Sequence, residues 1–453
     1  MGELLRLRRV VDGVVEQDLL VPLVDGEHPE SPRGADRDGG DHGEPRTIEC
    51  GTRAHRASIL TAGLPDRVAS AAVSARPPLG YEPGLDGIRA ISIAGVVLFH
   101  ACATSGLNGW FRGGGLGVSV FFTLSGFLIT TLLVRDIDVR GGVDLSRFWG
   151  RRIRRLAPAS LAAVVAVVVV SRTDWLDVHR GGAVAAVWSA TNWHVIASGD
   201  AQLLRTIVGA LGPTWSLAVE EQFYVALAVI AWLAARTARP ARNLGIVFAA
   251  VVPISIVLAN VVSDWSPRLE FGTDVRAAEL AIGGLLALAW RRWHEVLSRA
   301  VVARVADAVG IASVGGLVVL FLTADYTPPW LLRGGFSAVA VVTACLIVGV
   351  LAHGLLAAAL SAPPFVGLGR ISYSLYLVHW PVILVMTAGR TGLDGWVLVV
   401  AKAAVAIVAA VVLHLAVEQP IRARTDLSTR TTVAGWLIAS VAVTVLGLAL
   451  GAA

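Results

Sequence analysis

Apolar runs close to the length of a membrane-spanning helix dominate the chain. A helix that crosses a bilayer needs about 20 predominantly apolar residues, and about eleven such runs follow one another along the sequence. The pattern predicts an all-α, polytopic integral membrane bundle of about 10–11 transmembrane helices. The third run is short, and residues 183–210 leave room for an interfacial helix. The runs lie near residues 87–105, 114–134, 157–171, 215–235, 243–262, 275–290, 306–323, 335–352, 371–388, 395–416 and 433–451.

The composition excludes several classes of protein. Hydrophobic residues make up 55% of the 453 residues and charged residues 16%, whereas about a quarter of the residues in a soluble chain are charged. A soluble enzyme, a disordered protein and a nucleic-acid binder are therefore excluded. Cys50, Cys102 and Cys345 form no disulfide or zinc pattern. The single lysine, Lys402, stands against 37 arginines, and we assign no mechanism to it.

The net charge of +5 is unevenly distributed. Residues 1–80 hold 10 Arg against 13 Asp and Glu, a net charge of −3, so the remainder carries +8. The excess lies in every second loop between apolar runs, as the positive-inside rule describes for cytoplasmic loops. We therefore expect a cytoplasmic N-terminus. The basic loops are RDIDVRGGVDLSRFWGRRIRRLAP, RTARPARN, RRWHEVLSRAVVAR and QPIRARTDLSTR, after the second, fourth, sixth and tenth runs.

The chain divides into three segments. Residues 1–80 include PESPRGADRDGGDHGEPR, whose Gly, Pro and charge content predicts disorder; they are a cytoplasmic tail or the product of a misassigned start codon. Residues 81–425 hold most of the transmembrane domain, and residues 426–453 the final transmembrane helix. Since the sequence stops just after that helix, we expect no C-terminal extracytoplasmic domain.

The first run contains two ionisable residues, Arg89 and His100. Charged groups inside spans are costly and usually functional. Eleven residues at 100° each return to nearly the same helix face, about 16 Å further along the axis. One face therefore carries a cation near the cytoplasmic mouth and an imidazole deep in the bilayer, which favours a site. The alternative is a snorkelling Arg and a hydrogen-bonded structural His.

The fourth run opens with PTWSLAVEEQFY, which places Glu220 and Glu221 at about the depth of His100. Their side chains diverge by about 100°, so one of them is expected to face any given cavity. A carboxylate beside an imidazole orients it and raises its basicity. An equally weighted alternative is a structural carboxylate that pairs with Arg276.

The sixth run begins FGTDVRAAELAIGG, with Asp274 and Arg276 at its outer end and Glu279 one turn deeper. These residues either support a site or act as a helix cap and an interfacial anchor, the latter being favoured for Asp274 alone. In the ninth run, His379 lies near mid-membrane, just before Pro381. A proline frees a backbone carbonyl one turn earlier, so His379 either serves the site or satisfies that carbonyl.

The segment RFWGRRIRRLAP is denser in arginine than topology alone requires. Arginine forks match the geometry of phosphate, so the segment favours a phosphate-binding site over simple contact with anionic lipid. Small residues in GGGLGVSVFFTLSGFLIT suit close helix packing. The arginines are Arg147, Arg151, Arg152, Arg154 and Arg155.

Six segments together resemble the bacterial membrane-bound acyltransferase family 3, over about residues 81–425. They are LDGIRAISIAGVVLFH, GVSVFFTLSGFLIT, RFWGRRIRRLAP, TWSLAVEEQFY, TDVRAAELAIGGLLA and GRISYSLYLVHWP, in the family's order. The resemblance implies an integral-membrane O-acyltransferase of the bacterial cytoplasmic membrane that modifies surface glycans or glycolipids. It implies acyl-CoA, acetyl-CoA in particular, as co-substrate, with no metal and no nucleic-acid partner.

The resemblance also implies roles for individual residues. Arg89 and His100 match the family's central pair, and His379 matches its late histidine. Glu220 and Glu221 match the family's glutamate pair. The family's arginine motif corresponds to Arg151 and Arg154, or to the overlapping Arg152 and Arg155. One departure is Ser119, where many members have an acidic residue, so the acceptor is expected to differ.

These expectations combine into a mechanism. Cytoplasmic arginines hold the CoA phosphates, the pantetheine arm extends past Arg89, and His100 acts as general base or transient acyl carrier. Asp274 and Arg276 lie near the path of the acceptor. The alternative is a proton-coupled transporter, although no repeat symmetry is visible between the halves. A non-catalytic scaffold is a third class, which would not need His and Arg on one face.

Overall fold

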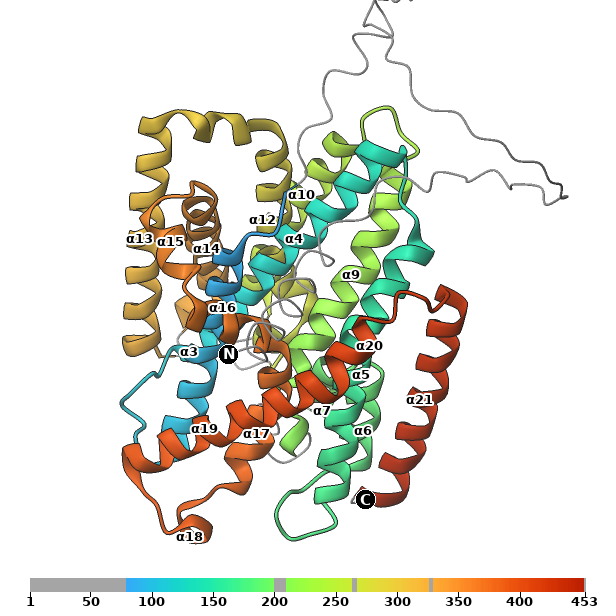
Figure 1. Cartoon of the computed structure of the whole chain (residues 1–453), viewed down its shortest axis with the longest axis vertical. Coiled ribbons are helices and arrows are strands. Elements are labelled where there is room, and N and C mark those ends of the chain that lie inside the picture. The colour runs from blue at the N-terminus through green and yellow to red at the C-terminus, as the bar shows by residue number, and fades with distance from the viewer. Residues whose placement is uncertain (1–78, 199–208, 263–266, 326–328, 452–453) are drawn as a thin grey trace, which may run out of the picture. The chain divides into compact units, whose positions relative to one another are not determined.

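All eleven apolar runs form helices in the computed structural model, which describes residues 79–198, 209–262, 267–325 and 329–451. These residues contain no strand, so the expected all-α class is confirmed. The long helices are α3 (Pro83–Ala103), α4 (Gly117–Arg140), α5 (Leu145–Val170), α9 (Thr214–Ala234), α10 (Pro240–Val261), α12 (Thr273–Trp293), α13 (Ala300–Thr323), α14 (Phe336–Leu351), α17 (Ser372–Val385), α19 (Gly395–Leu413) and α21 (Thr429–Leu450) (Figure 1).

Short helices occupy the connections. Two of them fall where an interfacial helix is expected, namely α6 (Arg180–Val187) and α7 (Thr191–Ser198). The others are α11 (Arg268–Phe271), α15 (Leu355–Leu360), α16 (Pro363–Arg370), α18 (Ala388–Thr391) and α20 (Gln419–Arg422), with 3₁₀ turns at Gly114–Leu116, Gly209–Leu211 and His294–Ser298 and π-helical turns at Leu331–Gly335 and His414–Glu418.

Within the described residues, nine helices are long and apolar enough to cross a membrane, or ten if the pair α16 and α17, bent by 70°, forms one span. Helix α12 is not among them because it carries five charged residues, three of them in its first two turns. A helical membrane bundle is thus confirmed, and its number of spans is near the lower end of the expected 10–11. Residues 1–78, for which a disordered tail is predicted, lie outside the described residues, and those from Glu82 on form one unit.

The start of the third helix differs from the expectation. Helix α5 begins at Leu145 rather than near 157, because the Asp144 side chain caps it by accepting from the Arg147 amide at 2.9 Å. The helix continues through Pro158, so the arginine-rich segment forms its first half. The placement of that segment in a loop was therefore wrong, and its arginines project from a helix in several directions.

Helices α3 and α4 form the centre of the bundle, with 67% and 72% of their apolar windows buried. Close backbone approach there depends on glycine, as expected for the second run. A Cβ on Gly126 would lie 2.0 Å from the Leu280 carbonyl oxygen of α12, and a Cβ on Gly283 would lie 2.0 Å from that of Thr123. Only a residue without a side chain permits this spacing.

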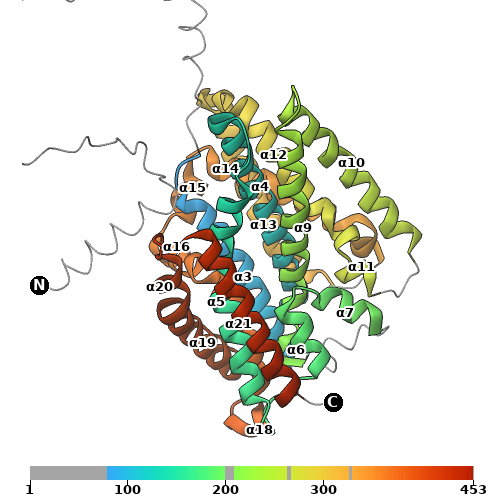
Figure 2. The ribbon, with the colours of Figure 1, turned by 90° about the vertical axis from the view of Figure 1, so that its right-hand side faces the viewer.

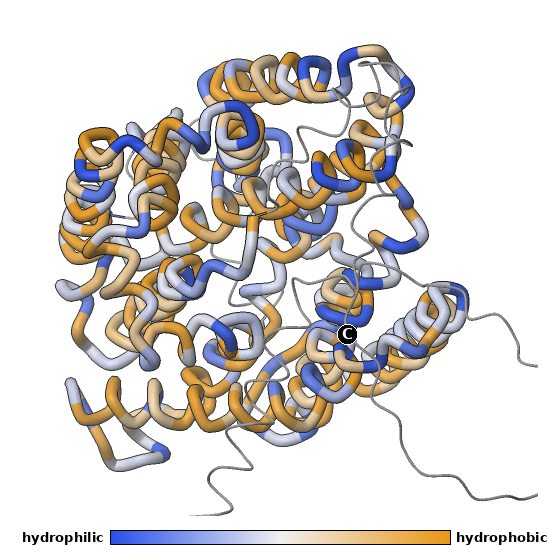
Figure 3. Tube along the Cα trace, turned by 45° about the horizontal axis from the view of Figure 1, so that its top comes forward, coloured by the Kyte–Doolittle hydropathy of each residue, from blue (hydrophilic) through white to orange (hydrophobic). Residues whose placement is uncertain are grey.

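The peripheral helices present apolar side chains outward. Helix α21, which packs along α5 and α6 (Figure 2), has 17% of its apolar window buried, and α10 has 22%. Ile254 on α10, Val305 on α13 and Ile438 on α21 are all more than half exposed. Hydrophobic positions run along the helices and hydrophilic ones gather at many of the turns (Figure 3). Such a surface is soluble only in lipid.

Candidate active site

Two histidines from distant parts of the chain meet inside the bundle. His100 Nδ1 of α3 lies 3.2 Å from His379 Nε2 of α17, and the ring centroids are 5.2 Å apart. His379 is fully buried, whereas His100 is partly accessible. Trp380 packs on His100 with its ring centroid at 4.9 Å. The pair therefore consists of an inner imidazole held by protein and an outer one that can reach a ligand.

The hydrogen bonds of His379 determine how the pair shares protons. Its Nδ1 lies 2.7 Å from the carbonyl oxygen of Tyr376 and 3.2 Å from that of Leu375. A carbonyl only accepts, so neutral His379 is protonated at Nδ1 and its Nε2 is an acceptor. His100 Nδ1 must then donate, which leaves the lone pair of His100 on Nε2. This is the tautomer that a general base or a nucleophile at Nε2 needs.

His379 was considered as the group that satisfies the backbone carbonyl freed by Pro381, but it bonds elsewhere. His379 bonds to the carbonyls of Tyr376 and Leu375, not to that of Leu377, the residue one turn before Pro381. The histidine thus bonds to its own helix and to His100 at the same time. The expected role of satisfying the carbonyl freed by Pro381 is therefore wrong, since His379 bonds to other carbonyls of α17.

The two glutamates of α9, Glu220 and Glu221, bond to different serines. The Ser125 hydroxyl of α4 donates to Glu220, and the Ser189 hydroxyl, between α6 and α7, donates to Glu221. His379 bonds to His100, so a histidine occupies the orienting position considered for a glutamate. Glu221 also lies close enough to Arg152 for electrostatic attraction.

Two tyrosines of α17, Tyr373 and Tyr376, lie near the glutamates of α9, and Tyr376 also contacts His379. Tyr373 and Tyr376 precede His379 at intervals of three residues, so all three lie on one side of α17. The Tyr376 hydroxyl is 2.6 Å from Ser216 Oγ, and that of Tyr373 donates to the Leu156 carbonyl at 2.8 Å. The sequence carried a signal for them, since the motif SYSLYLVH spaces the tyrosines and the histidine in this way.

The arginine cluster separates into two groups. Arg154 points to the start of α21, where it donates to Thr432 Oγ1 at 3.2 Å, and Arg151 lies 3.8 Å from Asp136. Arg152 points inward, with its guanidinium 3.3 Å above the centre of the Tyr224 ring. Arg155 also faces the interior, where its electrostatic neighbours include Arg89 and Arg152. Helical geometry separates the two groups, because neighbouring residues project about 100° apart.

The inward arginines leave capacity for an anion. Arg155 is exposed, and its electrostatic neighbours outside α5 are Arg89 of α3, Glu418 of the π-helical turn and Arg422 of α20. Arg152 Nε is buried and has no hydrogen-bond partner within the described structure. Arg89, on the same side of α3 as His100, pairs with Asp86 at 2.5 Å. A phosphate fits this arrangement, since it accepts several charge-assisted hydrogen bonds.

The charged residues near the start of α12 form a separate buried cluster, at the end of the bundle opposite the arginines of α5. Arg276 is fully buried and bonds to both carboxylate oxygens of Glu279, at 2.5 and 3.3 Å. It also donates to Ser119 Oγ at 3.2 Å and to the Glu270 carbonyl at 2.9 Å. The pairing considered between Arg276 and the α9 glutamates is thus replaced by a pair within α12. Ser119, the departure from the family pattern, is itself a partner of Arg276.

Two further carboxylates lie nearby, Glu270 on α11 and Asp274 in the first turn of α12. Asp274 accepts from the Arg268 guanidinium, and the helix is capped by Gly272 rather than by the Asp274 side chain. Burial raises the pKa of the Glu270 carboxyl to about 7, against the attraction of Arg276. Glu270 was not singled out from the sequence, because nothing in the sequence shows that it is shielded from water.

Lys402, to which the sequence assigns no role, is fully buried in α19. Its ammonium donates to Thr104 O at 3.1 Å, to Thr104 Oγ1 at 2.9 Å and to Ser105 Oγ at 3.0 Å. The Thr104 hydroxyl donates in turn to the His100 carbonyl at 2.7 Å. The lysine therefore holds the C-terminal end of α3, where a cation is favoured by the helix dipole, one turn from the candidate catalytic histidine.

The helical fold and the site define a polytopic membrane protein with a histidine pair inside the bundle. The inward arginines of α5 lie between this pair and the end of the bundle that carries the arginine-rich segment. Comparison with known proteins gives the family. The model of the acyltransferase domain matches residues 82–415, and the chain belongs to that family, which confirms the resemblance noted in the sequence.

Individual relatives are consistent with this assignment. O-acetyltransferase OatA of Staphylococcus aureus strain NCTC 8325 / PS 47 is 33% identical over 313 residues, which cover 67% of this chain and 51% of the relative. The protein SAS0844 of strain MSSA476 is 35% identical over 313 residues with the same coverage. This chain thus matches about half the length of these relatives. No solved structure matches it.

Proposed function

We propose that the protein is a membrane-bound O-acyltransferase that moves an acyl group, acetyl in the first instance, from cytoplasmic acyl-CoA to a hydroxyl of an extracytoplasmic glycan or glycolipid. The observation that carries the proposal is the His100–His379 pair, whose hydrogen bonds assign the lone pair of His100 to Nε2. The relatives named O-acetyltransferase support the acyl group, and the family resemblance supports the donor and the acceptor class.

The donor is proposed to enter from the basic end. Arg152 and Arg155 hold the phosphates of CoA, and the pantetheine arm runs along the face of α3 that carries Arg89 and His100. Eleven residues separate these two, a rise of about 16 Å. The thioester then lies beside His100 while the nucleotide remains at the arginines. Arg147 and Arg151 contribute a positive field at the mouth, whereas Arg154 bonds to α21.

His100 Nε2 is proposed to drive the transfer in one of two ways. As general base, it takes the proton of the acceptor hydroxyl while the oxygen attacks the thioester carbonyl carbon. The C–S bond breaks, the CoA sulfur takes the proton back from His100, and an ester remains on the acceptor. As nucleophile, Nε2 attacks the carbonyl carbon itself, the C–S bond breaks and CoA leaves as the thiolate. The acceptor hydroxyl then displaces the imidazole and releases its proton, which balances the charge of the thiolate.

The remaining site residues are proposed to support this chemistry. His379 fixes the tautomer of His100, and Glu220 and Glu221 place negative charge near the inward arginines. On the other side of the bundle, Asp274, Arg276 and Glu279 shape the path of the acceptor. Because Ser119 bonds to Arg276, the identity of residue 119 is expected to influence which acceptor is used.

Purified protein in nanodiscs tests the proposal. The protein should release CoA from acetyl-CoA in the presence of an acceptor glycan, and His100→Ala should slow the release about a hundredfold or more while the protein remains folded. Intact acetyl-CoA after incubation with the wild type would contradict an acyltransferase, and is the result expected of a transporter or a scaffold. Radiolabelled acetyl-CoA without acceptor separates the two routes, since only the nucleophilic route labels the protein.

The split of the arginine cluster provides a matched pair for the donor site. Arg155→Gln removes an inward cation and should raise the KM for acetyl-CoA about tenfold, because a charge-assisted hydrogen bond to phosphate is lost. Arg154→Gln removes the same charge from a neighbouring residue that faces α21 and should change this KM less than twofold. Equal effects of the two variants would contradict the proposed phosphate site.

A further inference from the structure

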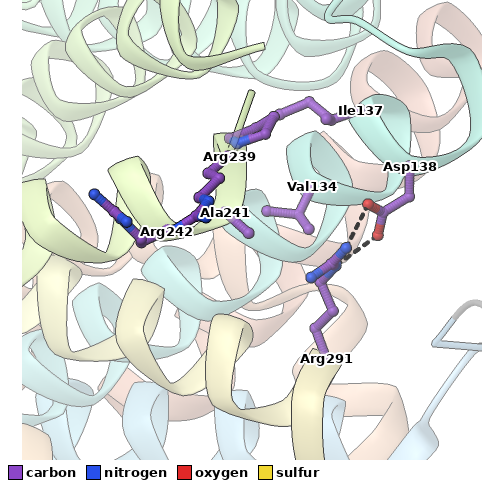
Figure 4. Close-up of a pocket in the computed structure, with 8 residues that line it drawn as sticks. Val134, Ile137, Asp138, Arg239, Ala241, Arg242 and Arg291 are labelled. Carbon is purple, nitrogen blue, oxygen red and sulfur yellow. Dashed lines mark hydrogen bonds and ion pairs between the residues drawn. The ribbon is translucent and has the colours of Figure 1, made fainter. Parts of the chain in front are cut away.

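A second cation-rich cavity lies away from the histidine pair, between the ends of α4, α10 and α12 (Figure 4). Its volume is about 270 Å³. One wall is apolar, formed by Val134 and Ile137 of α4 with Pro240 and Ala241 of α10. The other groups that line it are charged: Asp138, Arg239, Arg242 and Arg291. The cavity thus combines an apolar wall with a cluster of guanidinium groups.

Among the described residues that line this cavity, the positive charges outnumber the negative ones. Arg291 bonds to both oxygens of Asp138, at 2.6 and 2.7 Å, so this pair is neutral. Arg239 and Arg242 are exposed and add two positive charges. They lie at the N-terminus of α10, whose first helical residue is Pro240 and which has no side-chain cap. A helix N-terminus favours negative charge, so the cavity is suited to an anion.

The surroundings of the cavity point to a lipid as the source of that anion. Helix α10 is peripheral, and its surface below Arg242 is apolar and exposed. Ile246, Ile254 and Val257 lie within about 120° of Arg242 around the helix axis, and each is between 55% and 58% exposed. An anion bound at the arginines therefore lies at the end of an apolar ridge, as the phosphate of a phospholipid does above its acyl chains.

We propose that this cavity binds the phosphate-bearing headgroup of an anionic phospholipid, with an acyl chain along the exposed ridge of α10. The site is distinct from the candidate donor site, since its lining residues lie on α4, α10 and α12 or directly before α10, whereas the donor-site residues lie on α3 and α5. Bound lipid would tie the start of α10 to the ends of α4 and α12. Helix α12 carries the buried Arg276–Glu279 pair, so the lipid also braces that element.

Lipid retention by the full-length protein tests this proposal. The protein is purified, exposed to equimolar phosphatidylglycerol and phosphatidylcholine, and examined by native mass spectrometry. We expect selective retention of phosphatidylglycerol, and at least a tenfold loss of its affinity in Arg239→Gln/Arg242→Gln, since each cation near an anionic headgroup contributes appreciably to binding. The matched control is Arg424→Gln/Arg430→Gln, which removes two exposed arginines from another basic loop and should change the affinity less than twofold.

Two further experiments test whether the shape of the cavity matters as well as its charge, and whether the ligand is a lipid rather than a soluble phosphate. Ala241→Phe fills the cavity but keeps every charge, and should weaken phosphatidylglycerol binding as strongly as the double arginine variant. Glycerol phosphate at equal concentration should not compete with the lipid. An equal loss in the control, unchanged binding in Ala241→Phe, or effective competition by glycerol phosphate would each overturn the proposal.

Discussion

Replacement of His379 by phenylalanine isolates the role of the histidine pair. The new ring keeps much of the volume and apolar contact of the imidazole but removes the acceptor for His100 Nδ1 and the donor to the Tyr376 carbonyl. His100 is then no longer held in the tautomer with its lone pair on Nε2. The expected result is a lower kcat with little change in the KM for acyl-CoA, since His379 touches no substrate.

The size of the effect follows from the hydrogen bond that is lost. A buried donor left without a partner costs about 1–3 kcal/mol, and each 1.36 kcal/mol changes a rate tenfold. We therefore expect kcat of His379→Phe to fall about fivefold to a hundredfold. His100→Ala should cost more, because removal of a general base typically costs about 10²–10⁴-fold. His379→Gln should recover part of the loss, since an amide can both donate to a carbonyl and accept from His100.

A double-mutant cycle provides the decisive measurement. If His379 acts only through His100, the variant that combines His379→Phe and His100→Ala should be no slower than His100→Ala alone. The assay is acceptor-dependent release of CoA thiol by purified protein, with folding checked by size-exclusion chromatography. Wild-type kcat in His379→Phe, or losses that multiply in the double variant, would refute the orienting role.

Three further predictions concern stability. Gly283→Ala should destabilise the protein by about 1–3 kcal/mol, because the added Cβ would lie 2.0 Å from a backbone oxygen. Gly315→Ala in α13, where the added Cβ would have no atom within 4 Å, should be neutral or stabilising. Thermal unfolding in detergent compares the two variants, and equal unfolding midpoints would contradict the close packing at Gly283. The pKa of Glu270 is raised from 4.5 to about 7 in the folded state. Between these pH values the folded protein keeps a proton on Glu270 that the unfolded chain loses, so the free energy of unfolding should fall as pH rises from about 4.5 to 7. Glu270→Gln should flatten this pH dependence, and an unchanged pH dependence would show that another group is responsible. Lys402→Met should lower both the unfolding midpoint and kcat, since it removes the buried ammonium that bonds to the half-buried oxygens of Thr104. A variant with the stability and activity of the wild type would show that the lysine does not support α3.

The fold class could be predicted because hydropathy acts locally. Each apolar run must satisfy its own backbone in lipid, and a helix is the element that does so. The failure at α5 has the same origin: Arg147, Arg151 and Arg155 lower the hydropathy of a segment that is nevertheless helical, since the cap at Asp144 and the helix propensity of arginine do not depend on hydropathy.

The candidate site was predictable only in part. The common face of Arg89 and His100 follows from the period of one helix. The partner of His100 does not, because 279 residues separate it from His379, and both a glutamate of α9 and a histidine of α17 were chemically suitable. Likewise, no local pattern shows that Lys402 reaches Thr104.

Local residue patterns dictate what each segment is: apolar runs long enough to span, basic loops, and a few ionisable groups at stated depths along their own helices. Which of those groups meet depends on the packing of the helices. The inward and outward arginines of α5, the pairing of Arg276 with Glu279 and the histidine pair all depend on how helices rotate and pack against one another. Contacts between helices in lipid are set by close packing and buried hydrogen bonds, and these depend on all the neighbouring helices at once.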